Sequence, residues 1–157
     1  MTAFKALLSE FSEATGVAVD LTSDSVSLSA DGTPVYVQHR ADKDDIVIFT
    51  FPVGDSIPER PMMARALELS FNGSGTGGNF LGIRENAFVL SCVVPLEGLT
   101  AEAFAKRMLA LCAASDDVGK SLMAALTEDV IAEIDRREKD EDLRSAGGGE
   151  DTMIFNG

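Results

Sequence analysis

The sequence predicts a single domain of the α+β class. The chain has 157 residues, which suffice for one domain to bury about 70% of its unfolded surface without a metal or a crosslink. Hydrophobic residues make up 45% of the chain, too many for a disordered acidic segment. Segments with helical periodicity alternate with short runs rich in β-branched residues, which is typical of helices packed on a sheet.

Residues 2–15 are predicted to form a helix. Their apolar residues follow the i, i+3, i+4, i+7 pattern of one apolar stripe: Phe4, Leu7, Leu8, Phe11 and Ala14. Thr2 is a suitable N-cap, and Gly16 ends the helix.

Several β-type runs follow this helix. VAVDL, SVSLSA and PVYVQH predict a meander, in which Asp31-Gly32 supplies the positive φ angles of a tight hairpin. After a polar turn at residues 42–45, the run Ile46 to Val53 is apolar on both faces over its first half. This strand is therefore predicted to be central in the sheet or covered by a partner.

A second helix is predicted from about Pro58 to Phe71. Its apolar residues surround much of the helix, so more than one face must be covered: Met62, Met63, Ala66, Leu67 and Leu69. Glycine-rich residues 72–79 lead to the runs FLGI and AFVLSCVV, which predict a second hairpin across residues 84–86.

A third helix is predicted to begin at Thr100, its N-cap, with Leu99 placed to pack on Phe104. A further helical pattern from Val118 to Ile134 either continues this helix or starts a new one after a break at Ser115. It runs into an acidic helical segment that ends near residue 144. The predicted organisation is one domain over residues 1–144, with its core in residues 2–126, and a flexible tail at residues 145–157 with an apolar tip at residues 153–155.

The sequence predicts no catalytic site, metal site or cofactor. The glycines at positions 73, 75, 77 and 78 follow a helix and precede a strand, the reverse of a dinucleotide-binding motif. Gly119-Lys120-Ser121 lacks the upstream glycine of a P-loop. His39, the sole histidine, has no evident orienting partner and is expected at the surface, and the acidic turn at 42–45 lacks the spacing of a calcium loop.

The net charge and the positions of the cysteines limit which binding partners and which cellular compartment the sequence predicts. The net charge of −13 repels nucleic-acid phosphates and anionic lipids, and it favours a basic or polar protein partner. Cys92 and Cys112 lie in apolar segments without metal-ligand or redox spacing, as free thiols in a reducing compartment do. With neither a signal peptide nor a membrane span in its pattern, the chain is predicted to be cytosolic.

The sequence contains more apolar residues than a single subunit is expected to bury. The two-faced strand at Ile46, the second helix and the amphipathic first helix together favour a dimer with a partner-binding groove. The alternative is that the core of one subunit absorbs the same side chains.

Taken together, the segments resemble the effector chaperones of bacterial type III secretion systems, the Tir-chaperone family. The matching pieces are LLSEFSEATGV, the Asp31-Gly32 hairpin, IVIFTF, RALELSFN with its glycine-rich gap, GGNFLGI, FVLSCVVPLEGLT and an amphipathic helix from Ala101. The resemblance covers about residues 2–126, and RALELSFN followed by the gap and LGI is its most specific part.

This resemblance implies an α-β-β-β-α-β-β-α order, a twisted antiparallel sheet of about five strands, and a homodimer. It implies a bacterial cytoplasmic chaperone that binds the N-terminal segment of an effector in extended form. The implied effector groove comprises Phe4, Leu8, Phe11, Val35, Val37, Phe49 and Phe51. The implied dimer interface comprises Met62, Met63, Ala66, Leu69, Phe88 and Leu90.

Two other functions remain open on the residues alone. The same groove can sequester a transcriptional regulator or an anti-activator in place of an effector. An enzyme is disfavoured because no nucleophile and base are paired in the pattern. The chain departs from the family in its long acidic helix and in residues 145–157.

Overall fold

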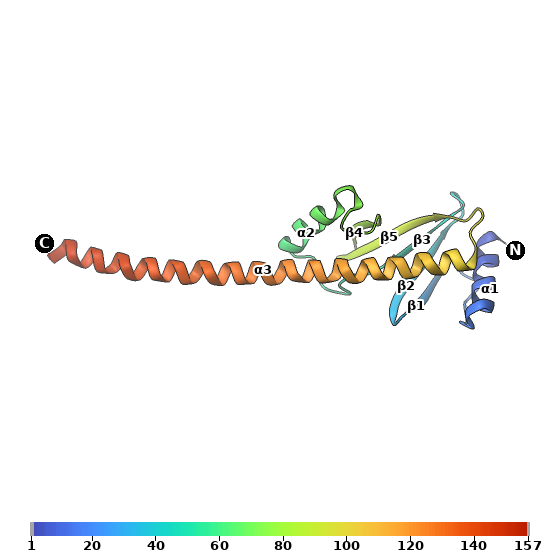
Figure 1. Cartoon of the computed structure of the whole chain (residues 1–157), viewed down its shortest axis with the longest axis horizontal. Coiled ribbons are helices and arrows are strands. Elements are labelled where there is room, and N and C mark those ends of the chain that lie inside the picture. Colours follow the sequence, from blue (N-terminus) through green and yellow to red (C-terminus); the bar gives the residue numbers. More distant parts are fainter. Residues whose placement is uncertain (1, 157) are drawn as a thin grey trace.

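The computed structural model describes residues 2–156, with side-chain surroundings for residues 2–146. The elements in chain order are α1 (Ala3–Thr15), β1 (Ser25–Ala30), β2 (Thr33–Arg40), β3 (Asp45–Thr50), α2 (Arg60–Ser70), the short 3-10 helix η1 (Phe71–Gly73), β4 (Phe80–Arg84), β5 (Ala87–Pro95) and α3 (Ala101–Asn156). The predicted α+β class and the predicted order of helices and strands are confirmed (Figure 1).

The caps of α1 are those predicted from the sequence. The Thr2 side chain accepts a hydrogen bond from the Lys5 backbone N–H, and Gly16 adopts a left-handed conformation that donates to the Ser12 carbonyl. The helix buries Phe4, Leu7, Leu8 and Phe11 of the stripe expected from its periodicity, whereas Ala14 is exposed.

One predicted strand is absent. Residues 17–21 (VAVDL) form no strand in the described chain, although Val19 and Leu21 pack against the core. The segment therefore buries alternate side chains as an extended loop without pairing its backbone. The first strand is β1, and Asp31 and Gly32 turn it into β2 with positive φ angles, as predicted.

The five strands form one antiparallel sheet in the order β1-β2-β3-β5-β4. β3 is central, as its two-faced apolar pattern predicted, and it pairs with β2 and β5. The cross-strand pairs Val37–Ile48 and Ile48–Cys92 place buried side chains on the inner face. The neighbouring pair Tyr36–Phe49 points to the opposite, outer face.

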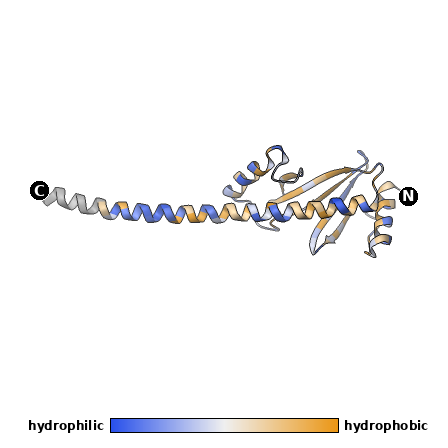
Figure 2. Ribbon diagram, viewed as in Figure 1, coloured by the Kyte–Doolittle hydropathy of each residue, from blue (hydrophilic) through white to orange (hydrophobic). Residues whose placement is uncertain are grey.

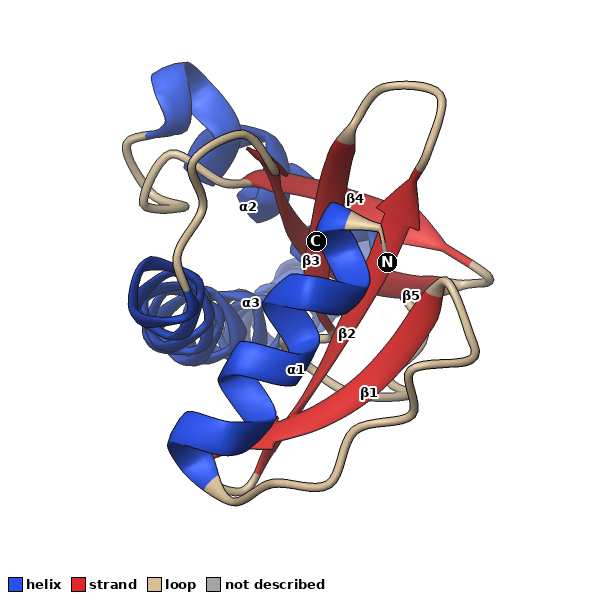
Figure 3. Cartoon of the chain, turned by 90° about the vertical axis from the view of Figure 1, so that its right-hand side faces the viewer, coloured by secondary structure: helices blue, strands red, loops and turns tan. Residues whose placement is uncertain are grey.

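All three long helices pack on the inner face of the sheet (Figure 3). α3 lies against β1, β2, β3 and β5, and it contributes the buried side chains Phe104, Met108, Leu111, Val118 and Leu122 to the core. α1 packs on α3, where Phe11 meets Phe104 edge to face at 5.4 Å between ring centroids. The outer face has no helix over it among the described residues.

The glycine-rich segment after α2 is a compact turn that returns the chain to β4. Buried Thr76 donates its hydroxyl to the Asn79 carbonyl (2.7 Å), and the Asn79 side chain donates back to the Thr76 carbonyl (2.8 Å). Gly75 lies against the backbone of Leu69, where a Cβ would clash. Close packing thus explains Gly75, whereas Gly73, Gly77 and Gly78 have positive φ angles.

α3 is one continuous helix, so the sequence pattern continues through Ser115 without a break. The Thr100 side chain accepts from the Ala103 N–H (3.1 Å), as expected of its N-cap. Ala125 and Leu126 are the last side chains that pack on the core, and beyond them the helix projects away from the body (Figure 1). Most of the tail predicted at residues 145–157, including its tip at 153–155, lies outside the residues whose side chains are described.

Gly119 is where α3 passes closest to the chain that leaves β3. A Cβ at this position would clash with the carbonyl oxygen of Pro52, and the next nearest atom would be the Pro52 carbonyl carbon at 3.2 Å. The glycine in the sequence Gly119-Lys120-Ser121 therefore permits helix packing.

We expect Gly119→Ala to lower the free energy of unfolding by about 1–2 kcal/mol, because forcing a methyl into a packed site outweighs the gain in helix propensity. Urea unfolding checks this value. Ala124→Gly, at an exposed site on the same helix, measures the propensity difference alone. A Gly119→Ala variant more stable than the native chain would contradict the close approach.

Arg40 and Asp45 pair directly across β2 and β3. Arg40 donates from Nε to Oδ1 (2.7 Å) and from Nη2 to Oδ2 (2.6 Å), and this hydrogen bonding lowers the pKa of Asp45 below its ordinary value. The carboxylate is thereby stabilised in the folded state.

We expect Asp45→Asn to destabilise the protein at neutral pH and to matter progressively less in acid. A carboxyl group with a lowered pKa adds stability above its unfolded pKa of about 3.9, and this is lost as the pH falls through the lower folded value. Urea unfolding of both proteins across that range measures the difference, with exposed Asp55→Asn as the control. A difference that stays constant through the acid range would refute the ion pair as its source.

Candidate functional site

An aromatic cluster occupies the outer face of the sheet. It consists of Tyr36 on β2, Phe49 on β3, Phe51 just beyond β3, and Arg84 on β4, and we call it the outer-face cluster. Tyr36 and Phe49 stack at 5.3 Å between ring centroids, and Phe51 meets their edges at 5.7 and 6.0 Å. The guanidinium carbon of Arg84 lies 5.3 Å from the centre of the Phe49 ring.

The cluster is half-buried by its own members and is open to solvent. Its three aromatic residues are of intermediate exposure, and Arg84 is exposed. Two hollows flank it. One of about 190 Å³ lies toward Ser25 and Ser27 of β1, and one of about 330 Å³ lies toward Ile57 and Asn86. The aromatic rings of the cluster provide an apolar surface, the two hollows provide recesses large enough for side chains, and Arg84 provides a cation beside them.

β1 forms one edge of the sheet beside this cluster. Among residues 2–156, no strand pairs with its outer side, so every second residue of β1 presents free backbone N–H and C=O groups. Such an edge can accept an additional strand from another chain.

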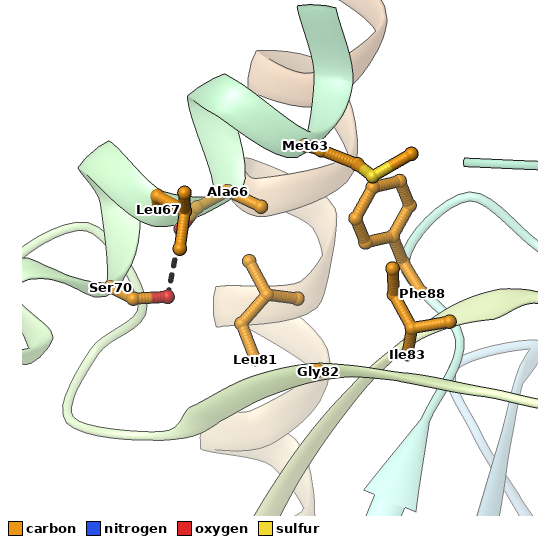
Figure 4. A pocket seen from close by; sticks show the side chains of 8 residues that line it. All are labelled: Met63, Ala66, Leu67, Ser70, Leu81, Gly82, Ile83 and Phe88. Atoms are coloured by element: carbon orange, nitrogen blue, oxygen red, sulfur yellow. Dashed lines mark hydrogen bonds between the residues drawn. The ribbon is translucent and has the colours of Figure 1, made fainter. Parts of the chain in front are cut away.

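A second apolar surface lies between α2 and β4 at the other edge of the sheet. We call it the α2–β4 patch. Its most exposed residues are Leu67 (77%) and, just after α2, Phe71 (72%). A hollow of about 320 Å³ is lined by Leu67 and Ser70, with Met63 and Ala66 of α2 above Leu81, Ile83 and Phe88 (Figure 4). The Ser70 hydroxyl at its rim donates to the Ala66 carbonyl (2.8 Å), so the lining is almost wholly apolar.

The residues predicted for the effector groove are divided between two environments. Phe4, Leu8, Phe11, Val35 and Val37 are all buried in the core on the inner face. Phe49 and Phe51 lie on the outer face, where the fold brings them together with Tyr36 and Arg84, which the sequence did not single out. The structure therefore does not assemble the seven residues into one groove.

The residues predicted for the dimer interface lie together around the α2–β4 patch, at different depths. Met63 is 40% exposed, Ala66 and Leu69 are half-buried, and Met62, Phe88 and Leu90 are buried beneath them. The exposed residues Leu67 and Ile83, which line the hollow, and Phe71 just after α2 were missed. The signal for Leu67 was the spread of apolar residues around α2.

The groups capable of chemistry have structural roles. Burial raises the pKa of the Cys92 and Cys112 thiols, which makes both poor nucleophiles. His39 was expected at the surface, but its side chain is only 8% exposed, because its ring stacks on Phe4 (4.8 Å) while Nδ1 lies 3.3 Å from an Asp24 carboxylate oxygen. No group of three or more His, Cys, Asp or Glu side chains in the described residues is arranged to hold a metal.

No helix in the described chain is both long enough and apolar enough to cross a membrane.

The sequence matches the Tir chaperone protein (CesT) family over residues 6–117. Comparison with curated proteins found no significant match. The fold is similar to those in several solved complexes. A chain of the HopA1–SchA chaperone–effector complex is 18% identical with a TM-score of 0.58, and the match covers 75% of this chain and 94% of that one.

Two further complexes contain the same fold. A chain of the ExsC–ExsE complex is 20% identical with a TM-score of 0.60, covering 76% of this chain and 92% of that one. A chain of the complex between the Yersinia pestis type III secretion chaperone SycH and a fragment of YscM2 is 14% identical with a TM-score of 0.55, covering 71% and 96%.

Proposed function

Since the chain belongs to the Tir chaperone protein (CesT) family, we propose that it is a type III secretion chaperone that catalyses no reaction. It acts as a homodimer in the bacterial cytoplasm and holds the N-terminal segment of an effector in extended form. The observation that carries this proposal is the open outer face of the sheet, with its aromatic cluster and a free strand edge beside it.

An extended polypeptide fits this arrangement. A client segment added to β1 would satisfy the free backbone groups of that edge, and alternate side chains would then lie on the outer face. The hollow of about 190 Å³ beside Phe49 and Arg84 lies between β1 and the aromatic rings, where such a side chain would fit. Backbone pairing then provides affinity for any sequence, and the recesses provide selectivity.

The charge of the chaperone supports the same role. A net charge of −13 keeps a protein with exposed apolar patches soluble, and it attracts a basic client. Because the client must be ordered on binding, its affinity per unit area is modest, which permits release for export.

The α2–β4 patch supports dimerisation. A hollow lined by Met63, Leu67 and Ile83, each at least 40% exposed, is rarely left open on a monomer. β4 is also the second edge of the sheet, so a twin subunit would cover both the patch and this edge.

We expect the protein to sediment as a dimer of about 33 kDa, twice its 16.6 kDa subunit mass. Leu67→Asp should shift the mass to that of one subunit, because it places a charge in the centre of the patch without touching the core. Sedimentation equilibrium measures the mass regardless of the elongated shape. Leu143→Asp, at an equally exposed leucine outside the patch, is the control. A native chain that stays monomeric at all concentrations would contradict the proposed dimer.

We expect Phe49→Asp to weaken client binding at least tenfold, because it removes the ring on which Tyr36, Phe51 and Arg84 converge. The client is identified by co-purification from the host and mass spectrometry, and its labelled N-terminal segment is then titrated by fluorescence anisotropy. Leu109→Asp, at an exposed leucine of α3, is the matched control. Unchanged affinity in a folded Phe49→Asp variant would show that the outer-face cluster is not part of the client site. Co-purification of a regulator in place of an effector would favour the regulatory function.

A further inference from the structure

The helix α3 extends well beyond the part of the chain that has the family fold. The family match ends at residue 117, and the three solved complexes cover 92–96% of their own chains with only 71–76% of this one. From residue 127 to residue 146, every side chain of α3 is exposed except half-buried Glu133. The extension is thus a separate structural addition that projects from the body (Figure 1).

Apolar side chains form a stripe along the first half of this extension. Met123 is 45% exposed, Val130 52%, Ile131 54% and Ile134 50%. Positions 123, 130 and 134 are seven and four residues apart, so they share one face of the helix, with Ile131 beside them. Figure 2 shows apolar colour on this stretch, which is followed by a strongly polar segment. A lone helix with such a stripe lacks a partner for it.

At the body end, the stripe runs into a hollow. This hollow, of about 350 Å³, is lined by Pro52, Val53, Gly119 and Met123, with the Asp116–Lys120 ion pair (2.9 Å) at its side. The hollow and the stripe together extend from residue 116 to residue 134, which is about 27 Å at the helical rise of 1.5 Å per residue. They are therefore long enough for a partner helix of about five turns.

Arg65 of α2 contacts α3 near the start of the extension. Arg65 donates to the carbonyl and the hydroxyl of Ser121 (3.3 and 3.1 Å) and to the Glu128 carboxylate (2.8 Å). These bonds lie on a different side of α3 from the stripe, because residues 121 and 128 are seven apart and offset from 123 and 130 by two. The bonds of Arg65 therefore leave the stripe uncovered.

The charges nearest the stripe are mostly acidic. Residues 121–135 contain the acids Glu128, Asp129, Glu133 and Asp135 and no Lys or Arg. Glu128 pairs with Arg65, and Glu133 pairs with Arg136 and Arg137 (2.6 and 3.3 Å). We propose that the stripe, defined as Met123, Val130, Ile131 and Ile134, is a docking surface for an amphipathic helix of another protein whose apolar face is bordered by Lys and Arg. Asp129 and Asp135 would pair with these cations while the apolar faces meet.

A second copy of this chain fits the stripe poorly. Pairing two such helices would bring acidic borders together. A coiled coil needs apolar positions over three or more heptads, whereas this stripe is followed by the charged run at residues 135–142.

The proposal is tested with two synthetic helical peptides of about 18 residues that share one leucine stripe, one bordered by lysines and the other by glutamates. We expect the full-length protein to bind the lysine peptide, measured by fluorescence anisotropy, with an affinity that falls as salt rises. Val130→Ser combined with Ile134→Ser should weaken binding about tenfold or more. Leu143→Ser, at an exposed leucine outside the stripe, should bind the peptide as the native chain does.

Several outcomes would overturn this docking site. They are no binding of the lysine peptide, equal binding of both peptides, or undiminished binding by the double variant. A fall in oligomeric mass in the double variant would show instead that a second copy covers the stripe. Phe49→Asp should leave peptide binding unchanged, and the double variant should leave client binding unchanged, so this site and the client site are tested independently.

Discussion

The packing of α3 along a single face of the sheet is the constraint on which the rest of the structure depends. The helix can lie against four strands because Gly119 lets it approach the Pro52 carbonyl, and its buried stripe from Phe104 to Leu122 then fills the inner face. Since α1 and α2 join it on that face, no helix of the described residues covers the other. Apolar residues of the outer face and of both sheet edges therefore stay accessible in the described chain.

The fold could largely be predicted because its local signals act over a few residues. Thr2, Gly16 and Thr100 cap helices, and Asp31-Gly32 turns a hairpin, whatever the rest of the chain does. The prediction of a strand at residues 17–21 (VAVDL) was wrong because strand formation depends on distant parts of the chain. Alternation shows which side chains are buried, as Val19 and Leu21 are, but strand pairing depends on a neighbour that the pattern does not reveal.

The interaction surfaces could be predicted only in part, because they depend on register. Val35 and Phe49 both belong to apolar runs, yet the pairing of Tyr36 with Phe49 places Phe49 on the outer face and Val35 on the inner one. Arg84 reaches Phe49 although β5 lies between β3 and β4, a contact that sequence neighbours do not suggest. Exposed apolar residues on α2 could be expected because its apolar residues surround much of the helix, but which of them lie at the surface could not.

The three exposed apolar surfaces lie on different elements and suit occupants of different shape. The outer-face cluster and the edge of β1 suit an extended chain, the α2–β4 patch suits a twin subunit, and the stripe on α3 suits a short helix. An extended client is held by many weak contacts and can be removed stepwise from one end, each step breaking only a few. A helix docked on α3 shares none of these contacts. It can therefore remain bound while the client leaves, which would hold the chaperone at the place of release without strengthening its grip on the client.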